Sequence, residues 1–301
     1  MDIGFIGLGK MGEKMVKRLL KNKINVVAYD VNSAKTAKLK HEGAIFSRSV
    51  RELASKLSTP RKIWVMLPSG ESTNKTLSNL LDILNAGDIV VDGSNSFYKN
   101  TISFHEKFLN KGVFLLDVGV SGGIYGYEKG YCIMVGGDKR AFENFEGIFR
   151  ILSTENGYLY VGKAGSGHFV KMIHNAIEYA MMEAITEGID LLKNGPFKEL
   201  NPKNILKLWN QNSIIQSFLV EMARKALERE ENLNDISPYV EDTGEGRWAV
   251  QTAIENKIPV PAIADSLFMR FISQREGNNL SFKVLALMRN EFGGHGVKKK
   301  K

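Results

Sequence analysis

The sequence is poor in cysteine and has no long hydrophobic run. Cys132 is the single cysteine among 301 residues, which excludes an internal disulfide framework and leaves too few thiolates for a structural zinc site. No window approaches the roughly 18 uninterrupted apolar residues of a membrane span, and residues 1–4 lead into a strand pattern instead of a signal peptide. We therefore expect a cytosolic protein whose redox chemistry, if it has any, depends on a cofactor.

Half of the net positive charge comes from the C-terminal end of the chain. The formal net charge is +8, but four of these charges belong to the terminal run Lys298–Lys301, which we expect to be a solvated, disordered end. Basic residues elsewhere are scattered and not interleaved with aromatic ones, so an anionic small substrate explains them at least as well as nucleic acid. We expect neither a nucleic-acid nor a membrane partner, and the length predicts two domains.

A glycine-rich turn follows the first apolar run, residues 3–6. The turn reads Gly7, Leu8, Gly9, Lys10, Met11 and Gly12. Apolar residues then recur at helical spacing at Met15, Val16, Leu19 and Leu20. Glycines in a strand–turn–helix context permit a tight turn, close approach of the backbone to a pyrophosphate and close packing of the helix. The segment therefore predicts a dinucleotide site, and the alternative is an ordinary glycine turn.

Asp30 ends the next apolar run, residues 24–29, and lies 18 residues after Gly12. An acidic side chain at the tip of the second parallel strand can accept hydrogen bonds from the ribose hydroxyls, and it repels a 2′-phosphate. Residues 31–35 contain no arginine, although they include Lys35. The pattern favours NAD over NADP.

Four more apolar runs alternate with helical or polar segments, at residues 63–67, 89–91, 113–118 and 133–135. This alternation predicts a Rossmann-type, doubly wound α/β sheet, whose ligands bind where strands end. The candidates in the loops after these strands are Leu67, Pro68, Asn95, Ser121, Gly122 and Gly123. Each loop alone is typical of an ordinary turn, but their shared position favours a binding role.

A polar stripe begins the second half of the chain, where a long run without proline or glycine starts at His168. Four residues at i, i+3, i+4 and i+7 share one helix face: Lys171, His174, Asn175 and Glu178. A solvated face is the ordinary explanation, but apolar residues wrap so widely around the stripe that we expect a buried helix. A buried lysine and glutamate need partners or a ligand, and burial shifts the pKa of each toward neutrality, which suits proton transfer.

The rest of the chain has helical spacing at residues 205–209, 218–227 and 263–272. Arg270 lies inside an apolar run, where its charge is unfavourable unless it meets an anion. The alternative is an arginine that reaches from a helix edge to solvent. We expect residues 1–163 to form the NAD-binding domain and residues 164–301 an all-helical domain for substrate binding and oligomerisation.

These motifs resemble the 6-phosphogluconate dehydrogenase family, within the beta-hydroxyacid dehydrogenases. The resemblance covers nearly the whole chain and is most specific at residues 92–96, 120–123 and 165–179. The His-Asn-x-x-Glu-Tyr pattern of residues 174–179 separates it from the hydroxyisobutyrate and tartronate-semialdehyde relatives. It implies oxidative decarboxylation of 6-phosphogluconate to ribulose 5-phosphate and carbon dioxide, with reduction of NAD, in the pentose phosphate pathway.

The resemblance also implies residue roles. Lys171 takes the proton of the 3-hydroxyl as hydride leaves, and its protonated form polarises the 3-keto group. Carbon dioxide leaves without a metal because the keto group accepts the electrons, and Glu178 protonates C1. Ligands of the carboxylate and hydroxyls are Asn95, Ser121, Gly122, Gly123, His174 and Asn175. Tyr179 and Arg270 hold the phosphate.

Residues 289–295 resemble the tail of the family, which reaches a neighbouring active site. Arg289 and His295 are therefore candidate substrate ligands donated between the subunits of a dimer or tetramer, and the alternative is a frayed terminus. The chain departs from the family's long form in its shorter length. It also has Thr243 where the long form usually has a phosphate-contacting lysine.

Two other functions stay open. One is an NAD-dependent dehydrogenase of another beta-hydroxy acid such as gluconate, and phosphate dependence of turnover separates it from the first. The other is a catalytically silent dinucleotide-sensing protein, against which the Lys171 and Glu178 pair argues.

Overall fold

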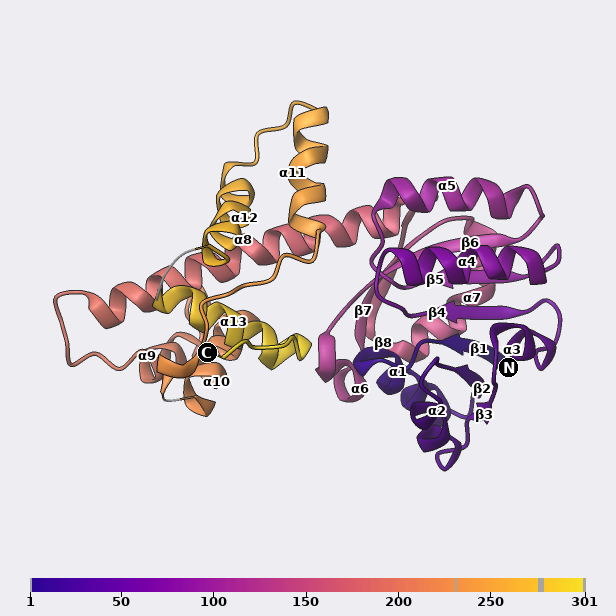
Figure 1. Cartoon of the computed structure of the whole chain (residues 1–301), viewed down its shortest axis with the longest axis horizontal. Helices are drawn as coiled ribbons and strands as arrows, with labels where there is room; N and C mark the ends of the chain where they lie inside the picture. Colours follow the sequence, from indigo (N-terminus) through magenta and orange to yellow (C-terminus); the bar gives the residue numbers. More distant parts are fainter. Residues whose placement is uncertain (1, 231, 276–278, 300–301) are drawn as a thin grey trace. The chain divides into compact units, whose positions relative to one another are not determined.

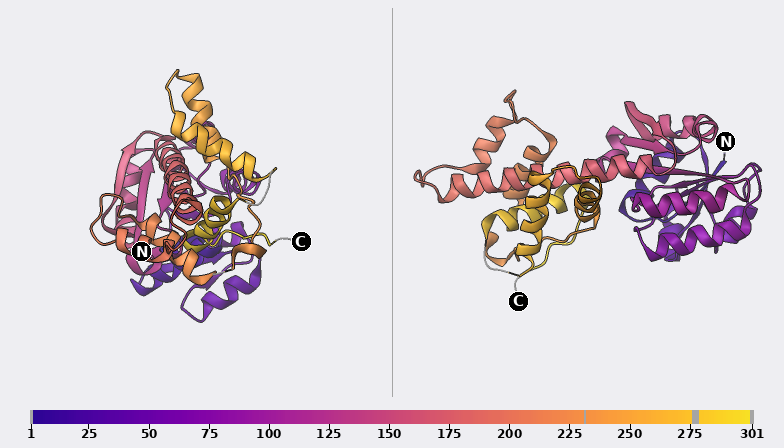
Figure 2. Two further views of the ribbon diagram at one scale, coloured as in Figure 1. Left: turned by 90° about the vertical axis from the view of Figure 1, so that its left-hand side faces the viewer. Right: turned by 90° about the horizontal axis from the view of Figure 1, so that it is seen from above.

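The computed structural model describes residues 2–230, 232–275 and 279–299. Contacts between residues divide the chain into two compact units, the first ending at Lys171 and the second beginning at Met172. The division falls within one helix, α8 (Ser166–Asn194), which is continuous in Figure 2. The domain boundary expected after residue 163 stays a prediction.

The first unit is built on an eight-stranded sheet with the order β3-β2-β1-β4-β5-β6-β7-β8, and Figure 1 labels its strands. The strands are β1 (Asp2–Ile6), β2 (Asn25–Tyr29), β3 (Ile45–Phe46), β4 (Lys62–Val65), β5 (Ile89–Asp92), β6 (Phe114–Ser121), β7 (Tyr131–Gly136) and β8 (Ser153–Gly162). Pairing is parallel from β3 through β6, whereas β7 is antiparallel to β6 and β8 is parallel to β7. The predicted Rossmann-type sheet is confirmed, and its last two strands run the opposite way.

Helices cover both faces of this sheet (Figure 1). They are α1 (Lys10–Lys21), α2 (Ser33–Lys40), α3 (Val50–Ser55), α4 (Glu71–Ile83), α5 (Tyr98–Leu109), α6 (Gly126–Lys129) and α7 (Lys139–Leu152), with a short 3-10 helix at Gly123–Tyr125. Strand side chains alternate between two hydrophobic cores. Val26 and Ala28 belong to the core that α1 and α7 cover, and Val27 between them belongs to the core under α3, α4 and α5.

Local sequence explains where several of these helices begin. The Asn32 side chain accepts a hydrogen bond from the backbone of Ala34 at the start of α2, and Ser49 accepts one from Glu52 at α3. Asp138 caps α7 in the same way. Such capping residues satisfy backbone N–H groups that have no partner within the helix.

The second unit is helical. Besides most of α8 it contains α9 (Pro202–Trp209), α10 (Phe218–Arg229), α11 (Glu245–Glu255), α12 (Pro261–Ser273), α13 (Leu280–Gly293) and a 3-10 turn at Leu233–Asp235. These confirm the three predicted helical segments. α13 is the central helix of this unit, because its residues from Ser281 to Arg289 are all buried. Within the described residues, no helix combines the length and apolar character needed to span a bilayer.

Candidate active site

The three glycines of the first turn have three different surroundings. Gly7 has a φ of 98°, and a Cβ there would overlap the carbonyl oxygen of Met66. A Cβ on Gly12 would overlap the carbonyl oxygen of Gly7. Gly9, in contrast, has no atom of the described chain within 4 Å of its Cβ position. Gly7 and Gly12 therefore serve close packing, and Gly9 leaves room for a pyrophosphate at the start of α1, where Lys10 and Met11 follow.

Asp30 supports this turn directly. Its side chain is only 7% exposed, and its Oδ2 accepts a hydrogen bond of 2.7 Å from the backbone N–H of Leu8. Oδ1 accepts a second bond, of 2.8 Å, from Asn32, and the Lys35 ammonium lies 3.5 Å from Oδ2. A carboxylate has about four acceptor positions, so Asp30 can still accept a ribose hydroxyl. The residues present fit a dinucleotide.

The other predicted loops lie at the ends of β4, β5 and β6. Leu67 and Pro68 follow β4, and the Pro68 carbonyl accepts a hydrogen bond of 2.8 Å from the Thr73 hydroxyl. Asn95 follows β5 with a φ of 55°, and its Oδ1 is buried with no hydrogen-bond partner in the described part of the chain. An unsatisfied buried acceptor is unfavourable, which makes Asn95 a candidate to bind a donor of a ligand. Ser121 ends β6, and Gly122 and Gly123 follow with φ values of 119° and 51°.

The polar stripe lies on α8, which begins two residues before the predicted start at His168. Lys171 is 5% exposed, so the expectation of a buried lysine is confirmed. The expectation of a buried glutamate is wrong, because the Glu178 side chain is 22% exposed, and His174 on the same face is 36% exposed. The helix is also less completely buried than its composition indicates, since Ile177 is 48% exposed. His174 Nδ1 lies 3.9 Å from the Glu178 carboxylate.

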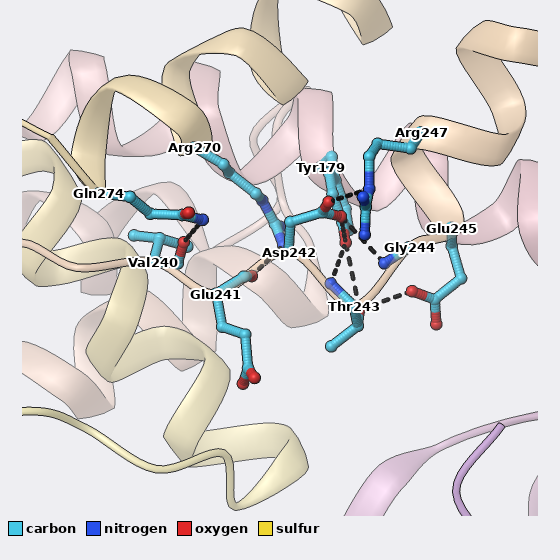
Figure 3. Close-up of polar contacts among 10 residues, drawn as sticks. All are labelled: Tyr179, Val240, Glu241, Asp242, Thr243, Gly244, Glu245, Arg247, Arg270 and Gln274. Atoms are coloured by element: carbon cyan, nitrogen blue, oxygen red, sulfur yellow. Dashed lines mark hydrogen bonds and ion pairs between the residues drawn. The ribbon is translucent and has the colours of Figure 1, made fainter. Parts of the chain in front are cut away.

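Tyr179 joins a polar network at the start of α11 (Figure 3). Asn175 contacts the same network through Glu245. Asn175 donates a hydrogen bond of 3.0 Å to one Glu245 oxygen, and the Thr243 hydroxyl donates one of 2.5 Å to the other. The Tyr179 hydroxyl lies 3.2 Å from that of Thr243 and donates to Asp242 at 3.4 Å. Thr243 is therefore held by its own unit and does not present a positive charge as a lysine would.

Arg270 packs against the same tyrosine (Figure 3). It is 1% exposed, and its guanidinium carbon lies 3.1 Å from the centre of the Tyr179 ring. Nη1 donates to the Glu241 carbonyl at 3.2 Å, whereas Nη2 is buried with no hydrogen-bond partner among the described residues. The alternative of an arginine that reaches solvent is wrong.

The charge of Arg270 persists at neutral pH. Burial is the main influence on its pKa and lowers it to about 10, and the nearby charge of Arg289 acts in the same direction. Arg289 is itself 5% exposed on α13. A buried arginine with an N–H that has no partner among the described residues is suited to bind a multiply charged anion.

Glu183 is a buried acid that the sequence analysis missed. It lies one turn after Tyr179 on α8, is 5% exposed, and its Oε1 has no hydrogen-bond partner among the described residues. Burial raises its pKa to about 7, the charge of Glu187 adds to this effect, and Arg270 opposes it. Its sequence position, four residues after Tyr179, was the available signal for a place on the same helix face.

The Glu183 pKa predicts a pH-dependent stability. Because its pKa is about 7 in the folded chain and its ordinary value is 4.5, its stabilising contribution is present below about pH 4.5 and is lost as pH rises through 7. We expect Glu183→Gln to increase the free energy of unfolding by ~2–3 kcal/mol more at pH ~8 than at pH ~5. Denaturant titrations at both values test this, with the exposed Glu155→Gln as the control. Equal effects at the two values would contradict it.

The C-terminal residues pack on their own unit. The Asn290 side chain donates a hydrogen bond of 2.6 Å to the His295 carbonyl, and Lys299 forms a β-bridge with Ile236. The Lys298 ammonium lies 3.3 Å from the centre of the Tyr239 ring. The expected disordered end is therefore wrong for the first two lysines of the tail, and Lys300 and Lys301 lie outside the described residues.

Comparison with known protein families shows which family the chain belongs to. The NAD-binding domain of 6-phosphogluconate dehydrogenase matches residues 2–162, and the C-terminal domain of 6-phosphogluconate dehydrogenase matches residues 167–300. The chain belongs to the 6-phosphogluconate dehydrogenase family. The predicted enzyme family is confirmed, with its dinucleotide-binding and helical parts.

Individual relatives are similar to this chain along nearly all of its length. The chain is 42% identical over 300 residues to YqeC of Bacillus subtilis, and the match covers 100% of both chains. It is 37% identical to the NAD-dependent, decarboxylating 6-phosphogluconate dehydrogenase of Haloferax volcanii, over 100% of this chain and 99% of that one. The structure of 6-phosphogluconate dehydrogenase from Plasmodium falciparum is 26% identical with a TM-score of 0.82, over 97% of this chain and 70% of that chain. The chain therefore matches the first two relatives along their whole length and spans 70% of the Plasmodium chain.

Proposed function

We propose that this 6-phosphogluconate dehydrogenase oxidises and decarboxylates 6-phosphogluconate, with NAD as the preferred hydride acceptor. The observation that carries the choice of a phosphorylated substrate is Arg270, a buried cation with a free N–H and no ion pair within the described residues. A phosphate group would supply the missing negative charge and hydrogen-bond acceptors. Gluconate has no anionic group at this end of the molecule, because its carboxylate lies beside the reacting carbons.

Two residues of α8 act as base and acid in this proposal. Lys171, in its neutral form, takes the proton of the 3-hydroxyl while the hydride on C3 passes to the nicotinamide. The resulting ammonium donates a hydrogen bond to the 3-keto oxygen. The bond between C2 and the carboxylate then breaks and its electron pair forms a C2–C3 double bond, the Lys171 ammonium gives its proton to the keto oxygen, and carbon dioxide leaves an enediol. Glu178 then protonates C2, which becomes C1 of the ketopentose phosphate, while Lys171 takes the proton of the C3 hydroxyl as the carbonyl re-forms.

The other predicted residues bind and orient the substrate. Tyr179 and Arg270 hold the phosphate, and their contact supports this pairing. In this proposal the carboxylate and hydroxyl groups of the substrate are bound by Asn95, Ser121, Gly122, Gly123, His174 and Asn175. Orientation of the reacting groups accounts for much of the acceleration in reactions of this kind.

Arg289 and His295 are proposed to act within a homo-oligomer. The resemblance of residues 289–295 to the family's tail supports donation of these side chains to the site of a neighbouring subunit. Light scattering on the purified protein would give the subunit number. A monomer with full turnover would contradict this part of the proposal.

The preference for NAD depends on Asp30 in this proposal. Replacing Asp30 by Ala removes the charge that repels a 2′-phosphate and releases Lys35, now 3.5 Å away, to bind it. We expect the ratio of kcat/KM for NADP over NAD to rise by on the order of tenfold or more, which corresponds to ~1.4 kcal/mol per factor of ten. Steady-state kinetics with both cofactors measures this ratio.

Asp30→Asn is the matched variant, because it removes the charge but keeps an acceptor for the Leu8 N–H. A shift in both variants assigns the effect to charge. An unchanged ratio in both would remove Asp30 from the account of cofactor choice.

The proposed activity is tested by mixing the purified chain with 6-phosphogluconate or gluconate, each with NAD or NADP. Reduced nicotinamide is followed by absorbance and carbon dioxide is collected from the same reactions. Equal amounts of both products from 6-phosphogluconate and NAD support the proposal. Turnover of gluconate alone, oxidation without carbon dioxide, or cofactor binding without turnover would each contradict it.

A further inference from the structure

The start of α8 is held by a buried carboxylate from the middle of the sheet. Asp117 on β6 is 0% exposed, and its Oδ1 accepts a hydrogen bond of 2.9 Å from the backbone N–H of Gly165. Its Oδ2 accepts a second, also of 2.9 Å, from the N–H of His168. Both oxygens therefore cap the helix that carries Lys171, and the negative charge lies where a helix favours it.

Glycines allow this end of α8 to touch the sheet backbone. A Cβ on Gly119 of β6 would overlap the Cβ of Lys171. A Cβ on Gly136 of β7 would lie 2.7 Å from Asp117 Oδ1 and 2.6 Å from the backbone nitrogen of Gly167. The first turns of α8 consequently pack on β6 and β7 with no side chain between them.

His168 supplies a second attachment in the same turn. It is 1% exposed, its Nε2 donates to the Asp92 carbonyl at 3.0 Å, and its Nδ1 lies 2.8 Å from the Thr101 hydroxyl. Asp92 is the β5 neighbour of Asp117 in the sheet register. The helix start is thus bonded to two adjacent strands and to α5.

We infer that Asp117 and Gly119 are positioning residues. Together they determine at which point along β6 the Lys171 side chain lies. Side chains two residues apart on a strand share a face, so Asp117, Gly119 and Ser121 form one row on β6. Two of the three contact α8, and the third begins the predicted substrate loop. The base and that loop are therefore placed by the same strand. This inference rests on the proposed role of Lys171 as base.

Small displacements of such a base have large effects. A general base has to lie within hydrogen-bond reach of the proton that it takes, and a displacement of about 1 Å can reduce the rate ~100-fold. Gly119→Ala would displace the Lys171 Cβ, because both overlapping atoms are attached to backbone and neither can rotate away. Asp117→Ala would leave two buried N–H groups without their acceptor.

The test uses the purified full-length chain with 6-phosphogluconate and NAD, and compares Gly119→Ala, Asp117→Ala, Asp117→Asn and Lys171→Met. Gly188→Ala is the matched control, since Gly188 lies on the same helix and, apart from the adjoining backbone of that helix, no atom of the described chain is within 4 Å of its Cβ position. Turnover is expressed per NAD-binding site, which corrects for unfolded protein. Substrate deuterated at C3 gives the isotope effect on kcat.

We expect kcat per NAD-binding site to fall ~100-fold in Gly119→Ala and Asp117→Ala, with the NAD dissociation constant nearly unchanged. Asp117→Asn should recover part of the loss, because its amide oxygen can accept one of the two hydrogen bonds. The isotope effect should be at least as large as in the unmodified chain, since hydride transfer is the step that slows. Gly188→Ala should keep the original kcat.

Two results would overturn the inference. One is an unchanged kcat in both Gly119→Ala and Asp117→Asn. Asp117→Asn is the milder of the two Asp117 variants, and its kcat is the one to compare if Asp117→Ala does not fold. The other is a lower kcat with an isotope effect that falls toward one, because a different step would then be affected. Full turnover of Lys171→Met would instead overturn the proposed role of Lys171, so the two failures are distinguishable.

Discussion

Lys171→Met is expected to reduce kcat by ~10³-fold or more, because it removes the group that takes the proton and then polarises the keto group, and acid–base groups contribute ~10²–10⁴-fold each. Methionine is unbranched, apolar and flexible, so it can occupy the buried path of the lysine stem. Lys171 is 5% exposed, and methionine has a side chain of similar length, so loss of the fold is not expected. The measurement is steady-state reduction of NAD with 6-phosphogluconate.

Binding of NAD serves as the reference for this variant. Calorimetric titration should give the same dissociation constant as the unmodified chain, because the glycine turn and Asp30 are unaltered. Lys193→Met is the matched control, since Lys193 lies at the exposed end of the same helix. Normal turnover of Lys171→Met would exclude it as the base.

Arg270→Met should raise the KM for 6-phosphogluconate by on the order of 10²-fold or more. Loss of one buried partner of a charged ligand costs about 2–5 kcal/mol, which corresponds to ~30-fold and above. The effect on kcat should be smaller, because the phosphate is remote from C1 and C3. Arg270 has no ion pair within the described residues, so its replacement leaves no carboxylate unpaired and should affect the free energy of unfolding little.

Arg224→Met is the control for charge and size. Arg224 lies on α10 and forms ion pairs of 2.8 Å with Glu221 and 2.9 Å with Glu228. We expect the Arg224→Met substitution to leave the KM for 6-phosphogluconate unchanged. Inorganic phosphate should compete with 6-phosphogluconate in the unmodified chain and lose this effect in Arg270→Met. An unchanged KM in Arg270→Met would place the substrate phosphate elsewhere.

Much of the first unit could be predicted because its signals are local. Short apolar runs, here of three to six residues, are typical of buried parallel strands, and glycines in a strand–turn–helix pattern indicate a nucleotide turn. β3 escaped prediction because two residues, Ile45 and Phe46, are too short a run to show a period. The reversed direction of β7 also left no mark, because a buried strand has the same hydrophobic pattern in either direction.

The second unit shows where local patterns stop being informative. A stripe at helical spacing indicated that Lys171 and Glu178 share a face, but not that one is buried and the other partly exposed. Glu183 was indistinguishable from a surface glutamate, since its burial depends on packing from other helices. Lys298 and Lys299 looked like part of a solvated tail until their contacts with Tyr239 and Ile236 were known.

The sequence by itself determined the fold class and the dinucleotide turn, because these depend on residue types at short, regular spacing. Its resemblance to a known family indicated the enzyme family and led to the proposal of Lys171 as base and Glu178 as acid. Tertiary structure alone decided that Asp117 caps α8 across the sheet, that Gly119 lies against Lys171, and that Arg270 is buried on Tyr179. Each of these joins residues 48 or more positions apart. Such contacts arise from packing of whole elements, which no local period encodes.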